Sequence, residues 1–125
     1  MQAAFERTLA FALERRAFGR AIGHHQAIRH KLAEIATEIE AARDVTYAAL
    51  RAYLAGDAVR EVTIAKLATQ RTAFRVIDDC LQIHGGAGYM EEYEIERAVR
   101  DARLGPIGGG TDEIMKEILG RSLGL

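Results

Sequence analysis

Apolar residues recur every three or four positions along most of this chain, which is the spacing of one face of an α-helix. The pattern is longest over residues 25–55, and at about 1.5 Å per residue it predicts one helix on the order of 45 Å long. Its apolar positions are Ile28, Leu32, Ile35, Ile39, Ala42, Val45, Ala49 and Tyr53. Residues 58–83 repeat the spacing with apolar residues on two sides, which indicates a helix wedged between neighbours.

Shorter patterns complete the chain. The opening residues place Phe5, Leu9 and Leu13 on one helical face, with Ala12 beside them. Gly56 is expected to end the first long helix and Asp57 to cap the second. Further helices are expected over residues 92–102 and 111–123. Together these elements predict an all-α protein, an antiparallel up-and-down four-helix bundle with short extra C-terminal helices.

Composition narrows the class of protein. The 125 residues suit one domain over residues 1–125, and 17 basic against 18 acidic residues leave no global charge to recruit nucleic acid. No apolar run approaches the roughly 20 residues that span a bilayer, so no membrane span is expected. The single cysteine, Cys80, excludes an internal disulfide, and its apolar flanks indicate a buried side chain rather than a nucleophile. We therefore expect a cytoplasmic protein.

Three stretches interrupt the bundle pattern. Residues 15–26 pair arginines with a helix start, and both features suit phosphate binding. Residues 82–103 end a helix with paired glycines, where a ligand could approach the backbone. Residues 106–118 run from three glycines into Thr111, a good N-cap, followed by acidic residues that suit a helix start. Each stretch has an ordinary structural explanation, but the three together in one small bundle favour a ligand site.

These stretches also carry a family resemblance. The segments "RRAFGRAIGHHQAIRHKLAEIA", "QIHGGAGYMEEYEIERAVRDAR" and "PIGGGTDEIMKEILGRSL" resemble the C-terminal helical domain of flavin-dependent acyl-CoA dehydrogenases, in order and in spacing. The resemblance covers nearly the whole chain and is strongest to the long-chain and isovaleryl types. It implies a larger subunit with N-terminal helical and middle β-domains that this chain lacks. Such a subunit oxidises acyl-CoA to 2,3-enoyl-CoA with FAD and passes electrons to electron-transferring flavoprotein.

The resemblance also implies self-association, as a dimer or tetramer, and a set of FAD contacts. Arg15 would meet the FAD pyrophosphate across a subunit interface, and Gln26 the adenosine half. Residues 82–86 would run along the FAD of a neighbouring subunit, and two residues at the last helix would lie beside the cofactor. The implied cofactor-binding residues are Arg15, Phe18, His25, Gln26, Gln82, Ile83, His84, Gly85, Gly86, Thr111 and Glu113.

No residue of this chain matches a catalytic base. Many family members have a glutamate at the position of Gly109, and the long-chain and isovaleryl types keep their base on a helix upstream of Met1. Glu113 is expected to act as a cofactor or helix-dipole partner. We therefore predict no catalytic residue within the chain and expect the isolated chain to be inactive.

Other functions stay open. The chain could be an accessory subunit that completes a partner's flavin site, or a stand-alone helical interaction module without ligand. A metal-binding bundle is disfavoured because the usual Glu-x-x-His pairs are absent, and His30 with Glu34 is a weak substitute. We predict no metal site, and the acyl chain length stays open.

Overall fold

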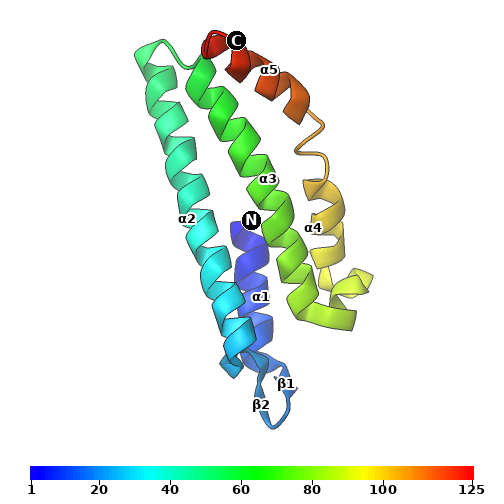
Figure 1. Cartoon of the computed structure of the whole chain (residues 1–125). Helices are drawn as coiled ribbons and strands as arrows, with labels where there is room; N and C mark the ends of the chain where they lie inside the picture. Colours follow the sequence, from blue (N-terminus) through cyan, green and yellow to red (C-terminus); the bar gives the residue numbers. More distant parts are fainter.

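Helix α3 (Val59–His84) lies at the centre of the fold and contacts every other helix. In the computed structural model, which describes residues 1–125, α1 (Gln2–Glu14) runs antiparallel to α2 (Gln26–Ala55), and α2 antiparallel to α3 (Figure 1). Two shorter helices, α4 (Ile95–Ala102) and α5 (Asp112–Ser122), then return one after the other along α3. The predicted all-α antiparallel bundle is confirmed.

The hydrophobic core lies mainly between α2 and α3. Ile35, Val76 and Cys80 are almost fully buried at its centre, and burial raises the pKa of the Cys80 thiol. Cys80 is therefore a packing residue, as its apolar flanks predicted. Most of the predicted α2 face is buried, but Tyr53 is exposed because it lies in the last turn of α2, beyond the core.

The predicted apolar face of α1 is wrong in part, since Ala12 is buried and Phe5 packs against the core as expected, but Leu9 and Leu13 lie outside the core. Leu9 and Leu13 are 37% and 58% exposed, and the buried residues are Ala4, Thr8 and Ala12. These small side chains let α1 approach α3 closely, and the Thr8 hydroxyl donates to the Ala4 carbonyl, which satisfies it inside the helix (2.8 Å). The two faces differ by one position in the sequence, so periodicity alone favoured the larger apolar residues.

Helix ends match the sequence in part. Gly56 adopts a left-handed conformation (φ +96°) and ends α2, as predicted. The predicted Asp57 cap is wrong, because Ala58 occupies the N-cap of α3 and no side chain caps it. The helix expected over 92–102 begins only at Ile95, since the preceding residues form the 3-10 turns η2 (Gly85–Tyr89) and η3 (Glu91–Tyr93).

A small β-hairpin between α1 and α2 was not predicted. Strands β1 (Arg16–Ala17) and β2 (Arg20–Ala21) pair antiparallel at the lower end of the molecule in Figure 1, and the 3-10 turn η1 (Ile22–His24) leads on to α2. The turn residues Phe18 and Gly19 both have positive φ, +51° and +83°, as a type I′ turn requires. Phenylalanine is an unusual residue for this turn, so only Gly19 signalled it in the sequence.

None of the helices is both long enough and apolar enough to cross a lipid bilayer.

Candidate functional site

The predicted cofactor-binding residues gather in two places. Most lie where α1 ends, the hairpin turns, α2 begins and α3 ends; we call Arg15, Phe18, His25, Gln26 and residues 82–86 the hairpin-end cluster. Thr111 and Glu113 lie instead at the start of α5, beside Arg71 of α3. From Arg71 to His84 the axis of α3 extends about 20 Å. The two groups therefore cannot contact the same small part of a ligand.

A groove of about 430 Å³ opens at the hairpin-end cluster. Its lining residues come from the C-terminal end of α1, η1, the end of α3 and η2: Phe11, Arg15, Ile22, Ile83, His84, Gly85, Gly86 and Ala87. Arg15 is exposed and takes part in none of the ion pairs of the chain. Its guanidinium is therefore free to bind an anion.

The paired glycines Gly85 and Gly86 line this groove. Gly85 has a backbone conformation that side chains disfavour (φ +58°, ψ −136°), so the turn itself requires glycine. Gly86 has no such requirement, and a Cβ atom built on it would meet nothing within 4 Å. The fold of this chain does not explain glycine at position 86.

His84 fixes the end of α3. Its Nδ1–H donates to the Cys80 carbonyl (2.8 Å), and its ring stacks on Phe11 with centroids 4.3 Å apart. Tyr93 packs edge-on against Phe11 at 6.0 Å. Because His84 and Ile83 are buried, residues 83–86 present mainly backbone to the groove. The sequence analysis did not single out Phe11, which lies in the first helix, and it included Tyr93 only as part of the stretch 82–103.

His25 holds the hairpin against the start of α2. A carbonyl can only accept, so the His25 Nε2–H donates to the Ala17 carbonyl (3.1 Å), and the Arg20 guanidinium donates to Nδ1 (3.3 Å). Both ring nitrogens are thus occupied within the chain. The Phe18 ring lies edge-on to His25, 6.0 Å away, and is 95% exposed.

Phe18 is exposed and has a positive φ, so a substitution can test whether its ring stabilises the hairpin. A residue other than glycine at positive φ costs about 1 kcal/mol, and asparagine tolerates this conformation best. We expect Phe18→Asn to raise the free energy of unfolding of the isolated chain by up to about 1 kcal/mol, measured by urea denaturation. A loss of stability would show that the Phe18 ring stabilises the hairpin, so strain would not explain its position.

The second group surrounds the glycine loop, which we define as residues 105–110, between α4 and α5. Gly109 and Gly110 both have positive φ, and a Cβ on Gly109 would meet nothing within 4 Å. The backbone N–H groups of residues 109–111 have no acceptor within the chain. The loop therefore presents unpaired donors beside the open space at Gly109.

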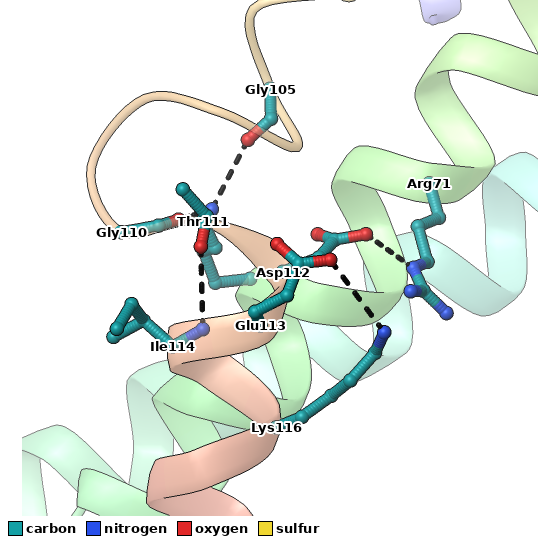
Figure 2. A network of polar contacts seen from close by, with 9 residues as sticks. Arg71, Gly105, Gly110, Thr111, Asp112, Glu113, Ile114 and Lys116 are labelled. Atoms are coloured by element: carbon teal, nitrogen blue, oxygen red, sulfur yellow. Dashed lines mark hydrogen bonds and ion pairs between the residues drawn. The ribbon is translucent and has the colours of Figure 1, made fainter.

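Side chains from α3 that the sequence analysis did not single out hold this loop. Figure 2 shows Arg71 facing Asp112 across the start of α5, with Arg71 Nε 2.6 Å from Asp112 Oδ2. The Lys66 ammonium donates to the carbonyls of Gly105 (3.1 Å) and Gly110. The sequence did not single out Lys66 and Arg71, because each is one charged residue within the apolar pattern of residues 58–83. Their role is visible only in the fold, where the loop and α5 pack against α3.

Glu113 behaves as a helix-start residue. Its own backbone N–H, together with the Thr111 hydroxyl, lowers the pKa of its carboxyl group. Thr111 caps α5 as predicted, its hydroxyl accepting from the Ile114 N–H (3.4 Å), and Lys116 lies 4.0 Å from the Glu113 carboxylate (Figure 2). An ionised carboxylate with a lowered pKa is a weak proton acceptor near neutral pH.

No three histidine, cysteine, aspartate or glutamate side chains lie close enough together to hold a metal ion.

Comparisons with known proteins bear on this geometry. The family described as "Acyl-CoA dehydrogenase, C-terminal domain" matches residues 1–124. The long-chain specific acyl-CoA dehydrogenase, mitochondrial, of Sus scrofa is 42% identical over an alignment of 123 residues that covers 95% of this chain and 28% of the relative.

Two solved structures share the fold. A probable acyl-CoA dehydrogenase from Mycobacterium abscessus is 43% identical with a TM-score of 0.95, over 98% of this chain and 33% of that one. The FAD complex of PigA is 30% identical with a TM-score of 0.93, over 99% and 33%. The chain thus spans about a third of the length of the relatives it matches. It belongs to the acyl-CoA dehydrogenase family and corresponds to that family's C-terminal domain.

Proposed function

We propose that this chain is the FAD-contacting and oligomerisation domain of an acyl-CoA dehydrogenase that oxidises acyl-CoA thioesters to 2,3-enoyl-CoA. The observation that carries the proposal is the open backbone at Gly85 and Gly86 beside the unpaired Arg15. An arginine fork and exposed backbone suit a pyrophosphate. When bound, FAD supplies the acceptor for the hydride that leaves the substrate.

The separation of the two groups supports contacts to more than one part of the cofactor. Arg15 and residues 82–86 would bind the pyrophosphate of a neighbouring subunit's FAD, with Gln26 toward its adenosine. Thr111 and Glu113 lie too far along α3 to share that contact. We therefore infer that the FAD sites are completed between subunits, and that the protein forms dimers or tetramers.

An exposed apolar surface supports self-association. The end of α2 and the start of α3 expose Tyr47, Leu50, Tyr53, Leu54, Val59 and Val62. Of these, Tyr53, Val59 and Val62 line one groove, and exposed apolar patches mark interfaces in soluble proteins. We expect sedimentation of the isolated chain at tens of micromolar to show dimers or larger species. A clean monomer without aggregation would contradict this.

The chain supplies no proton acceptor for the α carbon of the substrate. Gly109 has no side chain, and the Glu113 carboxylate is engaged at the start of α5. We infer that the chain binds FAD, helps to orient the acyl-CoA and leaves space for it at Gly109. The catalytic base then lies outside these residues. The isolated chain should then bind FAD only weakly, at about millimolar dissociation constant, and should not turn over acyl-CoA.

A hybrid subunit tests the proposal. In it, this chain replaces the matching C-terminal segment of the Sus scrofa long-chain enzyme. Reduction of an artificial electron acceptor is measured with acyl-CoA of several lengths. We expect turnover by the hybrid subunit and none by the isolated chain. A folded hybrid without turnover would contradict the proposal.

Glu113→Gln in the hybrid subunit tests the assignment of the base. Because the carboxylate acts only at a helix start, we expect turnover to fall no more than about threefold, as for one exposed helix-end charge. The measurement is kcat at saturating acyl-CoA. Loss of turnover with FAD still bound would identify Glu113 as the proton acceptor.

Electron-transferring flavoprotein as electron acceptor and a cytoplasmic location belong to the same proposal, the latter supported by the free, buried Cys80. The alternatives are a stand-alone helical interaction module and an accessory subunit that completes a partner's flavin site. The exposed apolar surface is compatible with both. A module would not restore turnover to the hybrid subunit.

A further inference from the structure

The glycine loop has little to hold its shape. Four of its six residues are glycines, which lose the most backbone freedom when they become ordered. Its backbone hydrogen bonds are local: the N–H groups of Ile107 and Gly108 donate to the Leu104 carbonyl (2.9 and 2.7 Å), and that of Asp112 donates to Pro106 (3.0 Å). None of these bonds reaches α3, so they do not fix where the loop lies on the bundle.

Lys66 provides that connection. Its ammonium group, on half-buried Lys66 of α3, donates to the carbonyls of Gly105 and Gly110, the first and last residues of the loop. These are the side-chain hydrogen bonds that the loop receives from α3. One positive charge therefore fixes both ends of the loop, and hydrogen bonds from charged donors are about twice as strong as neutral ones.

A second cation of α3 holds the residue after the helix cap. Arg71 Nε donates to Asp112 Oδ2 (2.6 Å), while Asp112 is buried and its Oδ1 has no partner. A buried carboxylate is costly to leave unpaired, so this contact keeps the start of α5 against α3. Cations of α3 thus hold the loop at Gly105 and Gly110, and the start of α5 at Asp112. At Gly109 the loop borders open space.

We propose that Lys66 is a positioning residue, which holds the glycine loop so that the space at Gly109 and the unpaired N–H groups of residues 109–111 face the acyl-CoA. The role at the substrate rests on the proposed function. The Gly110 carbonyl bound by Lys66 belongs to the same peptide group as the Thr111 N–H, so the contact orients that donor directly.

Hydrogen exchange of the full 125-residue chain tests the positioning alone. We expect Lys66→Met to speed exchange at the amides of Gly108 and Asp112 by about tenfold or more, and Lys66→Arg to restore most of the protection. The matched control is Lys31→Met, which removes the ion pair with Asp79 between α2 and α3 and does not touch the loop. Unchanged loop exchange in Lys66→Met, or an equal increase in Lys31→Met, would overturn the inference.

Kinetics of the hybrid subunit test the consequence for substrate. We expect Lys66→Met to lower kcat/KM by about tenfold or more at unchanged FAD content, with recovery in Lys66→Arg and wild-type values in Lys31→Met. Wild-type kcat/KM in Lys66→Met, or a loss that only follows FAD content, would overturn the role at the substrate. An inactive parent hybrid would contradict the proposed function instead, and hydrogen exchange would then decide the positioning by itself.

Discussion

Replacing Gly86 by valine should abolish most FAD binding while leaving the domain itself intact. A Cβ atom at this position meets nothing within 4 Å, so the free energy of unfolding of the isolated chain should change by less than about 0.5 kcal/mol. In the hybrid subunit the same side chain would occupy the space proposed for the FAD pyrophosphate. We expect the dissociation constant for FAD to rise about a hundredfold, equivalent to about 2.7 kcal/mol, measured by titration of the flavin-free protein.

Two further variants make this result specific. Gly86→Ala adds a smaller side chain and should give a smaller loss of FAD affinity. Gly120→Ala, in α5, also adds a Cβ that meets nothing, but it lies outside the candidate site. Its FAD affinity should equal that of the parent hybrid. An unchanged dissociation constant in Gly86→Val would show that FAD does not approach this backbone.

Truncation of Ile35 should give the largest loss of stability. Ile35 is 1% exposed at the contact of α2 with α3, and Ile→Ala at such a site removes buried surface and leaves a cavity. We expect the free energy of unfolding to fall by about 3 kcal/mol, a large part of the 5–15 kcal/mol typical of a domain. Urea denaturation of the isolated chain measures it.

Glu34→Ala is the control on the same helix. Glu34 is exposed and takes part in none of the ion pairs, so its truncation should change the free energy of unfolding by less than about 0.5 kcal/mol. Equal losses in the two variants would contradict the assignment of Ile35 to the core.

The long helices could be predicted because their apolar residues are large and regularly spaced. The same rule misplaced the face of α1, where Ala4, Thr8 and Ala12 pack against α3 and the larger Leu9 and Leu13 are exposed. It also gave no sign of the hairpin, because Phe18 occupies a turn position that phenylalanine seldom adopts. Local pattern describes a helix well, but it does not report how closely a neighbour approaches.

The residues of the candidate site also divide into those that the sequence indicated and those that only the fold revealed. Arg15, Gly85 and Gly86 stood out in the sequence because paired arginines and paired glycines interrupt the apolar helical pattern. Lys66 and Arg71 did not stand out, since each is one charged residue on a long helix. Their meaning depends on residues about 40 positions away, at Gly105, Gly110 and Asp112.

The most direct test of the central claim is the flavin content of the purified hybrid subunit. Absorbance of the flavin and of the protein gives the number of FAD molecules per subunit, and the Sus scrofa subunit truncated before the same segment serves as reference. If this chain completes the FAD site, the hybrid binds about one FAD per subunit and the truncated subunit binds little or none. A hybrid that is folded and oligomeric but contains no more FAD than the truncated subunit would contradict the account.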